Sequence, residues 1–166
     1  MNDQPLAEEC CPEFNPEKWD KKILTWNDRR FVKSSIPTLF HIPFPPTIGK
    51  KITGMWKSIE SSGAAAPDKT DTLVLFHDPS AFRSDILISV EKDVPGENNV
   101  TLSGDFISMT FDGGYNSVPK FITVMDRYLA ETGKKAKDYY VHYAYCPKCA
   151  RKFGHNYMIL FAELKS

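Results

Sequence analysis

The segment Gly104–Gly133 reads GDFISMTFDGGYNSVPKFITVMDRYLAETG. Its first part, Phe106–Phe111, is a short and mostly apolar run, which is typical of a strand. Asp112-Gly113-Gly114 follows as a turn. Beyond the turn, apolar residues recur at the spacing of one helix face: Val118, Phe121, Ile122, Met125 and Leu129. Gly133 comes just after this helix, where glycine commonly ends one. The segment therefore predicts a strand, a tight turn and an amphipathic helix over about 117–132.

The rest of the chain repeats this order. Two further strand-like runs, Tyr139–Tyr145 and Tyr157–Leu164, follow the helix, and a loop over Cys146–Gly154 joins them. The first half shows the same succession: a strand at Ile36–Ile42, a helix over 47–62, strands at Thr72–Phe76 and Ile86–Val90, and a turn at His77-Asp78-Pro79. We therefore predict an α+β fold of two strand–helix–strand–strand halves with pseudo-two-fold symmetry. Its sheets are antiparallel, and its helices lie on one side.

The N-terminal region has a different character. Two short runs flank Asn27-Asp28, which indicates a hairpin, whereas Asn15-Pro16-Glu17 has the residues of a helix start. The predicted organisation is thus an arm with a possible hairpin over 1–34, followed by one domain over 35–166. The halves of that domain cover about 35–94 and 100–166.

Composition narrows the class of protein. The chain has 21 basic and 21 acidic side chains, whereas a nucleic-acid-binding domain normally carries a basic face. Its apolar runs are too short to cross a membrane, and its first residues lack the apolar core of a signal peptide. We therefore expect a cytoplasmic protein that binds neither nucleic acid nor membrane. Its oligomeric state is not predicted.

Two segments resemble the GyrI-like small-molecule-binding family. Gly104, Gly113 and Tyr115 match its pattern of Gly, any residue, Tyr, Ala, followed later by His, any residue, Gly, Pro, Tyr. Tyr140–Pro147, YVHYAYCP, is similar to the family's Tyr-Glu-Ile-Tyr-Leu-Asn-Asp-Pro. The first pattern is matched with substitutions: Phe106 replaces the first Tyr, Phe111 the His and Gly114 the Pro.

The resemblance implies a stand-alone small-molecule-binding protein that holds an aromatic or heterocyclic compound in a groove between its halves. Family pockets surround a central Glu with aromatics; Val141 stands at that position, which implies a largely neutral ligand. Two alternatives are a hydrolase of a reactive small molecule, with a tyrosine or His77 activating water, and a protein-interaction module such as a gyrase modulator. Whether the chain is an enzyme is left open.

The candidate ligand-binding residues are aromatic. Side chains alternate along a strand, so Tyr143 and Tyr145 share a face of Tyr139–Tyr145 and present flat surfaces with hydroxyl groups. The alternative is that these tyrosines are interior residues with satisfied hydroxyls. The predicted set is Trp56, Tyr115, Tyr143 and Tyr145.

All four cysteines fall in two clusters, Cys10-Cys11 and the C-x-x-C of Cys146 and Cys149. Structural zinc is usually held by four such ligands in a tetrahedron. The cofactor hypothesis is therefore a structural zinc on all four, with His155 as a substitute ligand. Free thiols or a redox-active C-x-x-C are the alternatives.

Metal analysis tests this hypothesis directly. Protein purified without a histidine tag is expected to hold about one zinc per chain, because two C-x-x-C thiolates need two further ligands. Elemental analysis measures the metal, and a thiol reagent under native conditions measures the cysteines. Zinc well below stoichiometry, with all four thiols reacting freely, contradicts the hypothesis.

Overall fold

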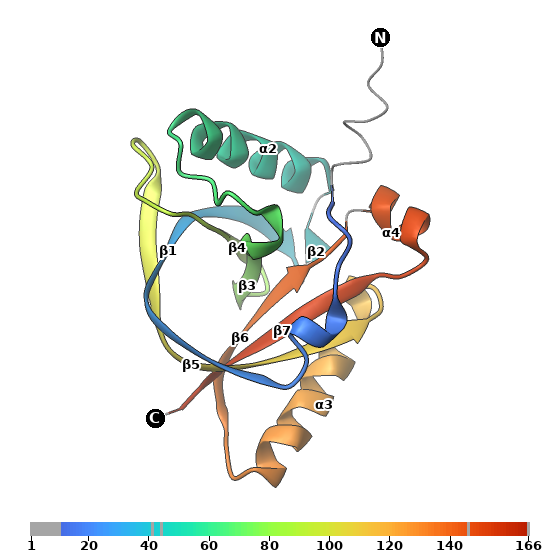
Figure 1. Cartoon of the computed structure of the whole chain (residues 1–166). Helices are drawn as coiled ribbons and strands as arrows, with labels where there is room; N and C mark the ends of the chain where they lie inside the picture. The colour runs from blue at the N-terminus through green and yellow to red at the C-terminus, as the bar shows by residue number, and fades with distance from the viewer. Residues whose placement is uncertain (1–10, 41, 44, 146, 166) are drawn as a thin grey trace. The chain divides into compact units, whose positions relative to one another are not determined.

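The computed structural model describes residues 11–40, 42–43, 45–145 and 147–165 (Figure 1). Its internal contacts divide the chain into two compact units. The terminal unit comprises Met1–Thr25 and Asp105–Ser166, and the central unit comprises Trp26–Gly104. Strands β1 (Lys22–Leu39) and β5 (Asn98–Asp112) each contribute residues to both units.

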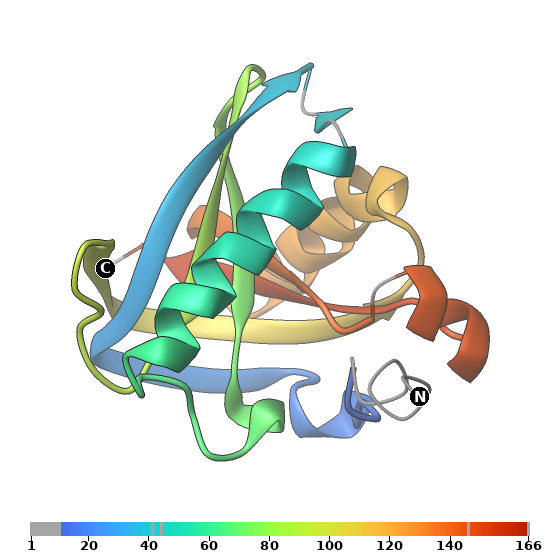
Figure 2. The same cartoon turned by 90° about the horizontal axis from the view of Figure 1, so that it is seen from above.

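The central unit is a sheet with one long helix on one face. Its strands follow the order β2-β1-β4-β3, with antiparallel β1–β4 and β3–β4 pairs in which Val32 lies opposite Ile88 and Leu75 opposite Leu87. Figure 2 shows the helix α2 lying across these strands. The remaining elements are β2 (Ile42–Pro43), α2 (Pro45–Ser61), the short 3-10 helix η2 (Lys69–Asp71), β3 (Val74–Ser80) and β4 (Arg83–Ser89).

Apolar periodicity explains this packing. Met55 and Ile59 lie one turn apart on α2 and are buried against Val32, Ile86 and Ile88 of the sheet. The sheet residues alternate along their strands, so each strand gives every second side chain to this core.

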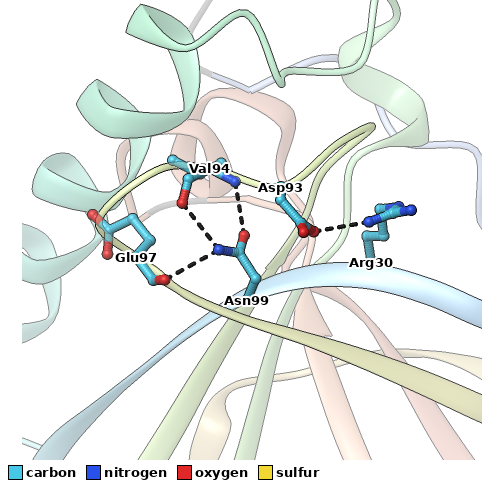
Figure 3. Close-up of polar contacts among 5 residues, drawn as sticks. All are labelled: Arg30, Asp93, Val94, Glu97 and Asn99. Carbon is cyan, nitrogen blue, oxygen red and sulfur yellow. Dashed lines mark hydrogen bonds and ion pairs between the residues drawn. The ribbon is translucent and has the colours of Figure 1, made fainter.

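A small polar cluster organises the connection from β4 to β5 (Figure 3). The side chain of Asn99 accepts the Val94 N–H at 2.8 Å and donates to the carbonyl oxygens of Val94 and Glu97 at 3.0 and 3.1 Å. Arg30 of β1 forms an ion pair with Asp93 at 2.8 Å. The amide thus supplies the backbone of this loop with partners that a strand ladder would otherwise provide.

The terminal unit repeats the plan, with strand order β6-β7-β5 and one long helix, α3, on one face. Leu160 of β7 lies opposite Met109 of β5 and Val141 of β6, and all three face Met125 and Leu129 of α3. The elements are η1 (Pro16–Lys18), η3 (Tyr115–Ser117), α3 (Val118–Glu131), β6 (Ala136–Tyr143), α4 (Pro147–Phe153) and β7 (Tyr157–Leu164).

These observations confirm the predicted α+β class, the antiparallel strands and both long helices. Three local predictions are wrong. The predicted loop at Cys146–Gly154 contains the seven-residue helix α4, and the predicted turn at His77-Asp78-Pro79 lies within β3. Instead of a hairpin at Asn27-Asp28, β1 continues unbroken.

The reason for the missing hairpin lies at Asp28. Its backbone has a positive φ of 51°, which suits a turn. However, its N–H donates to the Ser103 hydroxyl at 2.8 Å, and that hydroxyl donates back to the Asp28 carboxylate at 3.1 Å. These two hydrogen bonds to Ser103 of β5 therefore stabilise the irregular backbone at Asp28, and β1 continues past it.

Two adjacent residues of α3 provide a test of this packing. Met125 is fully buried in the core, whereas its neighbour Val124 is 38% exposed. We expect Met125→Ala to lower the free energy of unfolding by about 2–5 kcal/mol, because truncation leaves a cavity. Val124→Ala should change it by well under half of that. Urea denaturation measures both, and equal losses contradict the described orientation of α3.

Candidate functional site

A shallow hollow of 350 Å³ lies at one corner of the terminal unit, where β5 ends, α4 ends and β7 begins. The described arm and α4 lie at this same end of the unit in Figures 1 and 2. The residues that line the hollow are Asp112, Ala150, Arg151, Gly154, His155 and Asn156. Three of these side chains are able to exchange protons or form charged hydrogen bonds, so the corner is the candidate site.

Asp112 and His155 form a hydrogen-bonded pair in the hollow. Nδ1 of His155 lies 2.8 Å from Oδ2 of Asp112, and the Asn156 N–H donates to Oδ1 at 2.8 Å. These hydrogen bonds lower the pKa of Asp112, with the bond from His155 as the largest cause. An ionised Asp112 accepts a hydrogen bond from Nδ1–H, so the neutral imidazole presents the lone pair of Nε2.

Local backbone geometry holds the pair in place. Asp112 lies opposite Tyr157 in the β5–β7 register, and the Gly113 N–H donates to the Asn156 carbonyl at 3.0 Å. Gly154 has a φ of +74° and follows the last turn of α4, which turns the chain towards His155. The imidazole stacks on the Tyr157 ring at 4.7 Å. Both the hydrogen bond and the stack therefore fix the plane of the imidazole.

Arg151 brings a permanent positive charge to the same hollow. It lies in the last turn of α4, where a cation is favoured by the helix dipole. Guanidinium groups bind carboxylates and other oxyanions through paired N–H donors. The hollow thus combines an oriented proton acceptor with a group suited to an anion.

An aromatic cluster adjoins the hollow. Tyr145 is buried and stacks on Phe153 at 4.7 Å, and its ring lies 6.2 Å from that of Tyr157. The Phe14 N–H donates to the Tyr145 hydroxyl at 2.9 Å. Burial raises the pKa of Tyr145, and the hydrogen bond from Phe14 opposes that rise. Tyr145 therefore stays a neutral phenol and ties the arm to the cluster.

The arm also lines a second hollow, of 200 Å³, which shares Asp112 with the first. Two hydroxyls of β5 hold the arm: Ser108 donates to the Trp19 carbonyl at 2.6 Å, and Thr110 donates to the Pro16 carbonyl at 2.9 Å. Asp112 is therefore reached from two sides.

The predicted ligand-binding residues occupy different places. Tyr145 belongs to the corner just described, whereas Tyr143 packs against the core beneath α3. Trp56 lies on α2 and packs against the core of the central unit. Tyr115 begins η3. Their role in binding stays a prediction.

Two of the four candidate zinc ligands, Cys10 and Cys146, lie outside the described residues. Cys149 is 2% exposed on α4, and Cys11 lies in the arm, partly buried and close enough to Tyr145 to contribute to its raised pKa. Among the residues that the structure describes, no three potential ligands gather around one point. The zinc site therefore stays a prediction.

The sequence analysis did not identify Asp112 or Arg151 as site residues. It placed Asp112 in a turn and named His155 only as a substitute metal ligand. The signal that was available is the position of the two residues. Asp112 is the last residue of β5, and His155 lies two residues before β7. The antiparallel pairing of β5 with β7 brings the two residues together. His77, the predicted water-activating histidine, lies 3.8 Å from Asp85 in the central unit.

The fold and the site define an α+β domain with a histidine–aspartate pair at one corner. The fold is shared with solved structures, among them the following three. The C-terminal domain of EcmrR has a TM-score of 0.65 at 10% identity over 89% of this chain and 98% of that one. SAV2435 bound to tetraphenylphosphonium has a TM-score of 0.50 at 11% identity, over 89% and 94%. A hydrolase from Listeria innocua has a TM-score of 0.60 at 10% identity over 98% of each chain.

The chain belongs to the bacterial hydrolase family, whose model matches residues 1–164. No curated protein matches the sequence. Within the described part of the chain, no helix is both long enough and apolar enough to cross a membrane.

The lowered pKa of Asp112 predicts an acid-dependent contribution to stability. A carboxylate with a depressed pKa stabilises the fold above its unfolded pKa of about 4, and this contribution disappears as the pH falls through the folded pKa. We therefore expect Asp112→Asn to be less stable than the parent at pH 7, with the difference vanishing in strong acid. Urea denaturation across this range measures it. Asp126→Asn, an exposed change on α3, is the control, and a difference that persists in strong acid contradicts the prediction.

Proposed function

We propose that this protein binds a small aromatic or heterocyclic molecule and hydrolyses it, with His155 as the general base. The observation that carries the proposal is the 2.8 Å contact between His155 Nδ1 and Asp112 Oδ2 beside a hollow. Membership in the bacterial hydrolase family supports the reaction class. The SAV2435 structure supports the ligand class, because a protein with this fold is there bound to a molecule carrying four phenyl rings.

In the proposed reaction, Nε2 of His155 removes a proton from water while the water oxygen attacks an electrophilic carbon, such as the carbonyl carbon of an ester. Asp112 stabilises the imidazolium that forms. Arg151 stabilises the negative charge that develops on the carbonyl oxygen. The imidazolium then returns its proton to the leaving oxygen as the carbon–oxygen bond breaks.

The aromatic surroundings suit a flat substrate. His155 stacks on Tyr157, which lies 5.5 Å from Phe14 and 6.2 Å from Tyr145. Aromatic faces attract planar rings at such separations. Of the predicted ligand-binding residues, Tyr145 is the one that belongs to this cluster, and the roles of Trp56, Tyr115 and Tyr143 are part of the proposal.

Binding without turnover is the second candidate function. It is favoured by the exposure of the pair, because the side chains of His155 and Asp112 are 49% and 47% exposed. General acid–base catalysis normally benefits from a site that excludes water. In this case the protein holds its ligand unchanged, as an effector-binding domain would.

A panel of aromatic esters, including 4-nitrophenyl acetate, separates the two functions. Product formation is followed by mass spectrometry, with saturation kinetics required because free imidazole also hydrolyses activated esters. We expect His155→Gln to lower kcat by about 10²–10⁴-fold, the usual contribution of a general base. Asp112→Asn should also lower kcat, because an amide NH2 in place of Oδ2 donates to Nδ1 and favours the wrong tautomer of His155.

His77→Gln is the matched control, since His77 also lies beside an aspartate. It should leave kcat unchanged. A loss of activity in His77→Gln with full activity in His155→Gln would overturn the assignment of the base. Saturable quenching of tryptophan fluorescence without any product would support binding alone.

A further inference from the structure

We propose that the central unit carries a second binding site, specific for an anionic group, in which Lys33 and Arg83 surround the buried carboxylate of Asp85. The site takes a carboxylate or phosphate group of a small molecule. It does not rest on the proposed hydrolysis, because it lies in the other unit and uses different residues.

The sheet register brings the polar residues together. Ser35 of β1 lies opposite Asp85 of β4, and Asp85 lies opposite His77 of β3. Directly opposite residues of antiparallel strands point to the same face of the sheet. Lys33 precedes Ser35 by two residues and Arg83 precedes Asp85 by two, so both share this face as well.

This face is the one opposite α2. Ile86 and Ile88, which alternate with Asp85 along β4, belong to the core beneath α2. The side chain of Asp85 therefore points the other way. It is 2% exposed, and a buried carboxylate is costly unless its charge and its lone pairs are compensated.

Four groups provide that compensation. The Ser35 hydroxyl donates to Oδ1 at 2.6 Å, and Nε of Arg83 lies 3.3 Å from the same oxygen. Nζ of Lys33 lies 3.5 Å from Oδ2, and Nδ1 of His77 lies 3.8 Å from it. Both carboxylate oxygens are thus surrounded by donors.

The cations around Asp85 outnumber its carboxylate. Two permanent cations, Lys33 and Arg83, contact this one carboxylate, so among these three groups the positive charges exceed the negative charge. Their side chains are 34% and 56% exposed, so solvent and a ligand reach them. The contact of Arg83 with Asp85 uses Nε, and the terminal nitrogens of a guanidinium provide further donors in a fork that matches a carboxylate or phosphate.

In the proposed site, Asp85 holds Lys33 and Arg83 in place, and the anionic ligand competes with Asp85 for the same two cations. Replacing its carboxylate by an isosteric amide should therefore strengthen the binding of an anion. A site in which Asp85 itself binds a cationic ligand or acts on a substrate requires the opposite result. The Asp85→Asn variant thus distinguishes the proposal from the two obvious alternatives.

Titration with benzoate, inorganic phosphate and benzamide, followed by two-dimensional amide NMR, tests the proposal. Benzamide is the neutral counterpart of benzoate. We expect benzoate or phosphate to shift amide signals of β1 and β4 saturably at millimolar concentrations while benzamide does not. The stronger of the two anions shows whether a carboxylate or a phosphate fits the site.

Arg83→Gln should weaken anion binding by about tenfold, as expected for loss of a charge-assisted hydrogen bond. Lys33→Gln should weaken it less, and Asp85→Asn should strengthen it. Arg30→Gln is the matched control, because Arg30 is an exposed arginine of β1 that pairs with Asp93 instead. It should leave binding unchanged.

Equal binding of benzamide and benzoate, absence of saturable shifts, or unchanged affinity in Arg83→Gln overturns the proposal. Arg83 is more than half exposed, so Arg83→Gln is expected to fold. It decides the outcome even when Asp85→Asn does not fold.

Discussion

The antiparallel register of β5 with β7 determines where the candidate site forms. It places Asp112 opposite Tyr157 at the end of the ladder. The residues just before Tyr157 then have to meet Asp112, and His155 and the Asn156 N–H are the groups that do so. Shifting a strand register by one residue would turn every side chain to the other face. The core residues Met109 and Leu160, which pair within the same ladder, therefore fix the geometry of the hydrogen-bonded pair.

The two histidine–aspartate pairs differ in what surrounds the carboxylate. Asp112 is 47% exposed, and its oxygens accept hydrogen bonds from His155 and a backbone N–H, so the imidazole is its principal side-chain partner. Asp85 is buried, and a serine and two cations lie closer to its oxygens than His77 does. A carboxylate orients an imidazole best when nothing else competes for it. The first arrangement therefore suits proton transfer, and the second suits electrostatic binding.

Local patterns in the sequence were enough to predict the two long helices, because their apolar residues recur on one face and each helix is followed by a glycine with positive φ. Local patterns were not enough where contacts between residues far apart in the sequence determine the structure. Asp28 has the backbone of a turn, yet its partner Ser103 is 75 residues away. Asp112 and His155 are 43 residues apart, so no local motif could reveal the pair. Seven residues of α4 are too few for a clear periodicity.

Packing under α3 also constrains the turn that follows Asp112. Phe121 of α3 stacks on Phe111 at 4.4 Å, and a Cβ on Gly113 would lie 2.8 Å from an atom of the Phe121 ring. Only glycine lets the chain pass this ring and still donate its N–H to the Asn156 carbonyl. The residue before Asp112 and the residue after it are therefore both held by the same phenylalanine of α3. The core thus places the carboxylate that, in turn, orients the imidazole of His155.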